Sequence, residues 1–377
     1  MKKENTDNKG ALLEYRIKRL LFRMGYYCKM NIDIKATSDI NPDTISDLDV
    51  YGIYIHKDFS QKNIWADCKS GDAKPLERIA WINGVKNITG IDDVIFVKKG
   101  VRLSTKQYAL NKGVRIFDYE TIDELEHNYG IEQNDWRGSW NPQIANYIKV
   151  LKKIGVPNVD SYKKIGNFIV CDFWELDNYT RCKKSITALK QLNLAFQTPL
   201  ELVHLQAIQW GIYEITCLFT YSLLTMANDV YYISERDKEH LLRNGFVAGE
   251  IPLRKRKEMV EAIYKIVNTE IKYRVPEFAI ELEAPPGLGM APPNYFNAIF
   301  DVIKRITKSP LKYYDLLRYM DFTFMEYDMK KVKWNQAELA EIFNNSADLY
   351  YSAKTILHFI CDIIGVDKDL FQIFEKE

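Results

Sequence analysis

Two strand-like runs joined by a short polar turn constrain how the first third of the chain folds. Residues 49–55 (Asp-Val-Tyr-Gly-Ile-Tyr-Ile) show the alternation of a half-buried strand, and residues 63–69 (Asn-Ile-Trp-Ala-Asp-Cys-Lys) form a second such run. The intervening residues 56–62 are polar enough for a hairpin turn. Antiparallel pairing brings the start of one strand near the end of the other. We therefore expect Asp49 to lie beside Asp67 and Lys69.

The triplet Asp67-Cys68-Lys69 closes the second run. Side chains two residues apart on a strand share a face, so Asp67 and Lys69 can hold a metal ion and a nucleophilic water together. Another carboxylate, Glu14, lies at the flank of the apolar stripe of a helix predicted over residues 9–24 and ended by Gly25. Asp47 would share the face of Asp49 and is a secondary ligand candidate, although a turn residue at the strand entry is the simpler interpretation.

The alternative for each residue is structural. Charged residues make up 27% of the chain, so a D-x-K triplet also arises by chance, and Glu14 alone is compatible with a solvated helix charge. The predicted hairpin favours a functional site, because it gathers the strand residues at one end of a sheet.

This order of a helix glutamate, a strand aspartate and a strand Asp-x-Lys resembles the PD-(D/E)XK nuclease superfamily, in particular its restriction-endonuclease-like, Mrr-like and Holliday-junction-resolvase-like branch. The resemblance implies that Asp49 and Asp67 hold a divalent metal ion, that Lys69 positions or deprotonates the attacking water, and that Glu14 is the helix acid. Leu48 stands where the motif has its proline. The family's proline is frequently lost, so this departure weakens the match little.

The chemistry of phosphodiester hydrolysis explains these residue types. A carboxylate-bound Mg²⁺ lowers the pKa of bound water and polarises phosphoryl oxygens, and Mn²⁺ is expected to substitute for it. Mg²⁺ prefers oxygen ligands and keeps several waters, so the expected ligands are Asp49, Asp67, Glu14 and the backbone carbonyl of Cys68. A nearby cation would depress the pKa of Lys69, which leaves both a general-base and a water-orienting role open; we favour the orienting role.

The rest of the first 130 residues predicts an α/β domain with a mixed sheet flanked by helices, the restriction-endonuclease-like fold that the resemblance implies. Apolar periodicity predicts helices over 76–86, 104–111 and 121–127 and strands over 93–97 and 113–117.

Length and composition bound the remaining possibilities. A chain of 377 residues with 47% hydrophobic residues is expected to form two domains with real cores. The net charge of +1 argues against a uniformly basic nucleic-acid-binding surface and leaves a local basic groove open. The six cysteines show no metal-binding spacing, and no secretory signal is seen. We expect a cytoplasmic protein with free thiols and no membrane association.

Residues 131–142 break the periodicity with Gly and Pro, so we predict a linker there and a mainly helical domain over 143–377. A strand at 167–173 is the expected exception, and the Pro/Gly-rich residues 285–293 are expected to form a loop. The predicted helices cover residues 144–154, 185–194, 200–227, 254–269, 295–307, 311–319, 336–343 and 346–364.

The helical region has three basic clusters near aromatic residues, which can grip a nucleic-acid backbone or form ordinary solvated faces. They are Arg254–Lys257, Lys272 with Arg274, and Lys330 and Lys331 with Lys333. We expect a DNA endonuclease similar to prokaryotic restriction or phage-defence effectors, with a homodimer and an activating protein partner both open. The alternatives are a catalytically silent nucleic-acid-binding or scaffold protein that retains the nuclease fold, and a nuclease specific for junctions or RNA.

Overall fold

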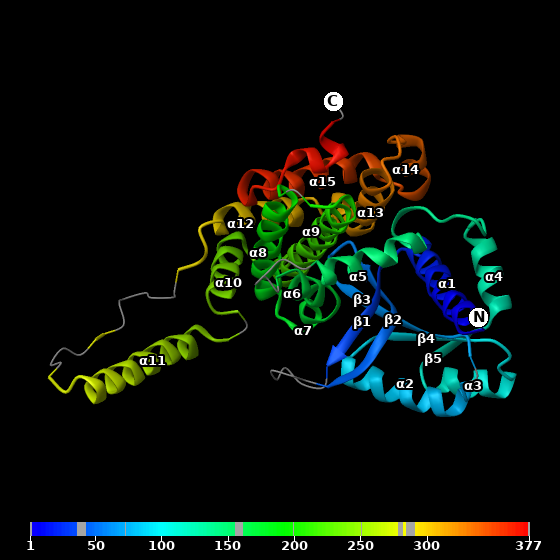
Figure 1. Ribbon diagram of the computed structural model, residues 1–377, viewed down its shortest axis with the longest axis horizontal. Helices are drawn as coiled ribbons and strands as arrows, with labels where there is room; N and C mark the ends of the chain where they lie inside the picture. Colours follow the sequence, from blue (N-terminus) through cyan, green and yellow to red (C-terminus); the bar gives the residue numbers. More distant parts are fainter. Residues whose placement is uncertain are drawn as a thin grey trace.

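A computed structural model describes residues 2–35, 43–71, 73–154, 161–198, 200–249, 251–277, 282–283 and 291–375. Strands and helices alternate in its N-terminal part (Figure 1). In chain order these are α1 (Lys2–Arg23), β1 (Tyr27–Lys35), β2 (Thr44–Ile55), β3 (Gln61–Lys69), α2 (Pro75–Thr89), β4 (Asp93–Lys98), α3 (Leu103–Asn111), β5 (Val114–Phe117) and α4 (Tyr119–Asn128).

The five strands form one mixed sheet in the order β1-β2-β3-β4-β5. Strand β2 is antiparallel to its two neighbours, β1 and β3, whereas β4 and β5 run parallel to β3. The predicted hairpin is confirmed, with Ile55 opposite Gln61 at its turn end and Val50 opposite Ala66 towards its open end. The sequence analysis did not predict β1, which extends the hairpin into a three-stranded meander.

Helices cover both faces of the sheet, as expected. On one face Leu13, Ile17 and Leu21 of α1 pack against strand residues that include Ile64 and Ala66. On the other face, Ile79, Ile82 and Val85 of α2 pack against a cluster that includes Trp65. The alternation of β3 therefore sends successive side chains to opposite helices, as the period of two requires. Figure 1 shows the sheet lying between α1 and α2.

The remainder of the described chain is helical, which confirms the expected change in architecture after the sheet. The helices are α5 (Ala145–Lys153), α6 (Ser161–Asn167), α7 (Phe173–Glu175), α8 (Asn178–Phe196), α9 (Leu202–Val230), α10 (Glu235–Ala248), α11 (Leu253–Arg274), α12 (Phe296–Lys308), α13 (Leu316–Thr323), α14 (Gln336–Ile342) and α15 (Ser346–Phe359). Helix α9 is buried along most of its length and is the centre of this part. In the described part of the chain, no helix combines the length and apolarity needed to cross a membrane.

Two local predictions in the helical part were wrong. The expected strand at 167–173 is instead a helical segment, made of the end of α6, a π-helical turn at Phe168–Asp172 and α7. Its short apolar run is buried on several sides, and such runs do not distinguish a strand from a buried helix. The helix expected at 311–319 begins later, as α13, after a 3₁₀ turn at Pro310–Lys312. Most of the loop predicted at 285–293 lies outside the described residues.

The segment predicted as a linker is partly buried between the sheet and the helices. Trp140 is fully buried, with ring centroids 4.7 Å from Phe22 of α1 and 5.4 Å from Phe322 of α13. The backbone N–H of Gly138 donates to Glu326 at 2.7 Å, and Glu326 also pairs with Lys330 at 2.5 Å.

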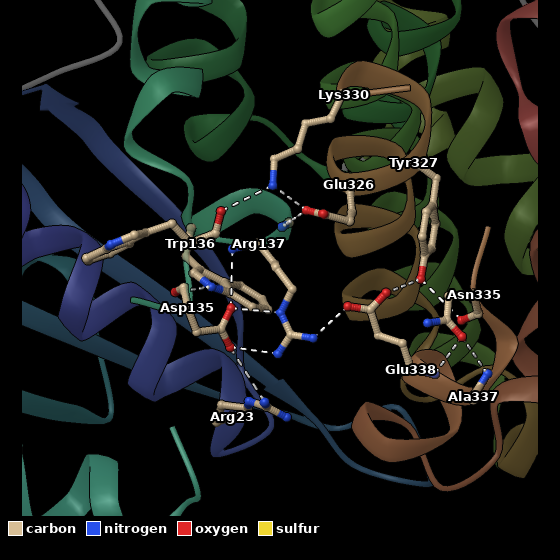
Figure 2. Close-up of polar contacts among 12 residues, drawn as sticks. Arg23, Asp135, Trp136, Arg137, Glu326, Tyr327, Lys330, Asn335, Ala337 and Glu338 are labelled. Carbon is tan, nitrogen blue, oxygen red and sulfur yellow. Dashed lines mark hydrogen bonds and ion pairs between the residues drawn. The ribbon is translucent and has the colours of Figure 1, made fainter. Parts of the chain in front are cut away.

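Arg137 continues this contact with two carboxylates (Figure 2). It pairs with Asp135 at 2.8 Å and with Glu338 of α14 at 2.6 Å. Glu338 in turn accepts a hydrogen bond of 2.7 Å from the hydroxyl of Tyr327. The segment thus joins α1 to the C-terminal helices through both aromatic packing and ion pairs.

This packing predicts that Gly138→Ala destabilises the protein. Gly138 has a φ of +52°, and an added Cβ would lie 2.5 Å from a ring carbon of Phe322. Left-handed strain and overpacking together should cost about 2–4 kcal/mol of unfolding free energy. The measurement is the urea unfolding midpoint.

Gly130→Ala is the matched control, because Gly130 has a φ of +62° with no atom within 4 Å of an added Cβ. It should cost only about 1 kcal/mol. Equal losses in the two variants would show that residue 138 is not tightly packed.

Candidate functional site

Asp49 and Asp67 lie where β2 and β3 leave their ladder. The last pair recorded between these strands is Val50 with Ala66, so each aspartate is one residue beyond it. Strand β3 continues to pair with β4 as far as Lys69 opposite Lys98. Both carboxylates are buried, Asp49 at 4% and Asp67 at 1% exposure. The sheet therefore holds two buried acidic side chains at the point where β2 and β3 separate.

Lys69 connects the two aspartates. Its Nζ lies 3.1 Å from Oδ2 of Asp49 and 3.2 Å from Oδ1 of Asp67. The same Oδ2 of Asp49 accepts a hydrogen bond of 2.6 Å from the backbone N–H of Cys68. The structure thus brings together the three strand residues singled out in the sequence. The main chain of the D-x-K triplet holds Asp49 in place.

Glu14 faces this group from α1 without a direct polar contact to it among the described residues. Burial, followed by the negative charge of Asp49, raises the pKa of Glu14 to about 7, and Lys69 opposes this shift. Asp47 contributes to the raised pKa of Glu14 but is exposed and lies opposite Asp33 in the β1–β2 ladder. Glu14 is therefore close enough to sense the charges of the strand residues, whereas Asp47 is at the periphery.

Arg78 of α2 belongs to the site, and the sequence analysis did not identify it. Its guanidinium donates to both oxygens of Asp67, at 2.8 Å from Nε and 2.5 Å from Nη2. The guanidinium carbon lies 3.6 Å from the ring centroid of Trp81, which itself packs against Trp65. The sequence offered one signal for this role: Arg78 lies one turn before Trp81 on the helix that follows the triplet.

The backbone beside Asp49 is irregular. Asn31 of β1 stands opposite Asp49 in the register, between the pairs Met30–Val50 and Ile32–Leu48, and has a φ of +53°. Positive φ in a residue other than glycine is uncommon, and such residues cluster at functional sites. Strand β2 changes its packing at Asp49. Val50 packs in the core on the α1 side of the sheet, whereas Leu48 packs in the core on the α2 side.

The electrostatics of the cluster follow from burial and ion pairing. Burial raises the pKa of Asp49, although Lys69 and the Cys68 amide oppose the shift. Burial by itself would lower the pKa of Lys69, but the charges of Asp67 and Asp49 outweigh it and raise that pKa. Lys69 is therefore a protonated donor at neutral pH, and two cations, Lys69 and Arg78, face the three carboxylates.

Among the described residues, no three or more His, Cys, Asp or Glu side chains are grouped as a formed metal site. Asp67 is occupied by Arg78 and Lys69, and Glu14 is separate from the pair. Cys68, whose carbonyl is an expected ligand, pairs with Val97 of β4. The thiol of Cys68 is buried, and burial raises its pKa well above the ordinary value.

The basic clusters of the helical part differ in their surroundings. Arg254 and Lys257 lie on α11, which projects from the other helices (Figure 1), and they pair with Glu258 and Glu261 of the same helix. Lys330 is instead engaged in the contact with Glu326 described above.

No protein-family model, curated protein or solved structure matches this chain.

The raised pKa of Glu14 predicts a pH-dependent loss of stability. The pKa is about 7 in the folded state against 4.5 ordinarily, so folding favours the protonated form. The contribution of Glu14 to stability is fully present below pH 4.5 and is lost as the pH rises from 4.5 through 7. Because the side chain is partly solvated, the loss should be on the order of 1–2 kcal/mol. We expect Glu14→Gln to remove it in urea unfolding with EDTA.

Glu124→Gln, which changes an exposed glutamate of α4, should leave the pH dependence intact. A pKa of 7 affects stability over about pH 5 to pH 8. If Glu14→Gln and the wild type lose stability in parallel over this range, the folded protein does not disfavour the ionised form of Glu14.

Proposed function

We propose that this chain is a metal-dependent endonuclease that hydrolyses phosphodiester bonds of DNA. The observation that supports this most is the convergence of Asp49, Asp67 and Lys69 from two strands at the open end of their hairpin, with Lys69 Nζ within 3.2 Å of both carboxylates. Glu14, on a helix packed against the same sheet, completes the helix–strand–strand order that the PD-(D/E)XK resemblance implies.

The reaction requires a water to attack phosphorus and the ester oxygen to leave with a proton. Lys69 is suited to orient the water or to donate a hydrogen bond to the phosphate, because its raised pKa keeps it protonated. Asp49 fixes the ammonium of Lys69 and is itself fixed by the Cys68 amide. The chain thus positions a donor rather than a free base at the point of attack.

The donor set fits a hard divalent cation. Asp49, Asp67, Glu14 and the carbonyl of Cys68 would supply the oxygen ligands that Mg²⁺ prefers. Such an ion would lower the pKa of a bound water and neutralise the phosphate charge. Burial, followed by the negative charge of Asp49, raises the pKa of Glu14, and a bound cation would favour its ionised form. Arg78 must then release Asp67, because it occupies both carboxylate oxygens.

The ion pairs of Asp67 also favour a second candidate. With Arg78 and Lys69 both bound to it, Asp67 is compensated without any metal, as in a purely structural ion-pair cluster. This supports a catalytically silent nucleic-acid-binding or scaffold protein as the alternative.

We predict that the protein cuts DNA with Mg²⁺ or Mn²⁺ and not with EDTA. Asp67→Asn should abolish cutting, and Lys69→Met should slow it about 10²–10⁴-fold by removing a positioned donor. The assay follows supercoiled plasmid, linear duplex, single-stranded DNA and RNA on gels.

Lys62→Met is the matched control, because Lys62 is also on β3 and pairs with one aspartate, Asp93, at 2.8 Å. It should cut at the wild-type rate. Absence of cutting on every substrate, with nucleic-acid binding retained in all variants, would instead support the silent binding protein.

Arg78→Gln should tighten Mn²⁺ binding by roughly tenfold or more, because it removes the guanidinium that competes for Asp67. Titration calorimetry measures this affinity without reference to cleavage. The variant should also be less stable than the wild type in EDTA, and Mn²⁺ should raise its Tm more.

Arg115→Gln provides the control, since Arg115 pairs with Asp93 on the same sheet, away from the site. Weaker Mn²⁺ binding by Arg78→Gln would mean that Arg78 positions Asp67 instead of competing for it.

A further inference from the structure

A cavity of about 500 Å³ lies between the sheet and the helical part. Its walls come from α1, β1, α5 and α9, and α5 packs directly on α9. Figure 1 shows α5 following the segment that leaves the sheet domain and passing in front of the strands. The volume lies in the range of small-ligand sites.

Four lysines from three elements line the cavity: Lys18, Lys29, Lys149 and Lys152. The first two are buried and engaged internally. Lys18 donates to the carbonyl of Ser139 at 2.7 Å, and Lys29 pairs with Glu214.

Lys149 and Lys152 lie three residues apart on α5 and so share a face. In the described part of the chain neither has an ion pair. Glu14, Asp33 and Glu214 also line the cavity, and Lys29 already compensates Glu214. The two α5 lysines therefore form a cationic wall available to an anionic group.

Trp210 of α9 adds an unused donor. It lines the cavity, is only 6% exposed, and its indole N–H has no hydrogen-bond acceptor among the described residues. Buried donors are nearly always paired, so an unpaired one calls for an explanation. A ligand with an acceptor oxygen or ring nitrogen would supply the missing partner. Ile144, in the 3₁₀ turn before α5, and Ile148 of α5 add the apolar surface that a flat ring requires.

The cavity reaches the candidate site. Glu14 lines it from α1, and Asn31, which stands opposite Asp49 in the ladder, lines it from β1. A ligand here would therefore lie beside Glu14, whereas Asp49, Asp67 and Lys69 do not line the cavity.

We propose that this cavity binds a phosphate-bearing nucleotide unit, with the phosphate at Lys149 and Lys152 and the base beside Trp210. This inference rests on the proposed function, because it places a nucleotide next to the phosphodiester-cutting site. The nucleotide has two sources, a unit of the substrate strand or a free mononucleotide, and both present the same phosphate and base.

Fluorescence anisotropy in EDTA tests the proposal without cleavage. The probes are a labelled, 5′-phosphorylated hexadeoxynucleotide and, as unlabelled competitors, AMP and dAMP. The double variant Lys149→Gln/Lys152→Gln should bind the oligonucleotide at least tenfold more weakly, with a smaller dependence of log Kd on log salt. Trp210→Phe, which keeps an aromatic ring and removes the N–H, should weaken binding several-fold.

Lys153→Gln is the control, because Lys153 is the next residue of α5, is exposed and does not line the cavity. It should bind as the wild type does. Competition by mononucleotides would identify a free nucleotide as the ligand, whereas binding of the oligonucleotide alone would identify the substrate strand. No binding of either probe, or equal binding by the control and the double variant, would overturn the proposal.

Asp67→Asn separates this inference from the proposed function. Cavity binding that persists in a wild type unable to cut any substrate would leave the inference standing and remove the nuclease. If instead the wild type cuts and Asp67→Asn does not, while Lys149→Gln/Lys152→Gln binds as the wild type does, the nuclease would stand and the cavity proposal would fall.

Discussion

A buried cluster of four charges holds the sheet against the helices. Lys29 of β1 pairs with Glu214 of α9 and lies 3.9 Å from Asp321 of α13, and all three are at most 7% exposed. Lys18 of α1 is equally buried. Removing such charges from water costs several kcal/mol per ion unless each keeps its partner. Burial lowers the pKa of Lys18, whereas Glu214 and Asp321 outweigh burial and raise that of Lys29. The arrangement is therefore stable only when all four elements stay docked.

This docking reaches the candidate site through α1. Lys18 is tied to the carbonyl of Ser139, in the segment that Trp140 anchors between Phe22 and Phe322. Glu14 lies one helical turn before Lys18 on the same face. The helical part therefore fixes where Glu14 stands relative to Asp49. It also forms the wall of the cavity opposite β1, so the space next to Glu14 is bounded by both parts of the chain.

The sequence predicted the elements whose patterns are local. The alternation at 49–55 and the triplet at 67–69 were sufficient to place Asp49, Asp67 and Lys69 together, because an antiparallel register is set by the turn. Strand β1 was missed although its pattern is also local, because Met30, Ile32 and Ile34 alternate with polar residues as in a half-buried strand. Arg78 was missed because a bidentate contact between a helix and a strand depends on how α2 packs on the sheet. The buried state of Gly138 and Trp140 likewise depends on distant α13.

The charge balance at Asp67 explains how the fold accommodates a buried carboxylate. Asp67 is only 1% exposed, and burying a charge is costly unless an opposite charge is close to it. Lys69 is shared with Asp49, so Arg78 supplies the dedicated compensation, and its stacking on Trp81 holds the guanidinium in place. Arg78 contacts both oxygens of Asp67 and Lys69 contacts one of them, so under the proposed function a divalent ion would bind Asp67 in place of Arg78. A guanidinium released at this edge is planar and bidentate, the geometry that suits a phosphate as well as a carboxylate. Under the proposed function, therefore, the group that stabilises the metal-free protein becomes available to the substrate in the state that carries out the reaction.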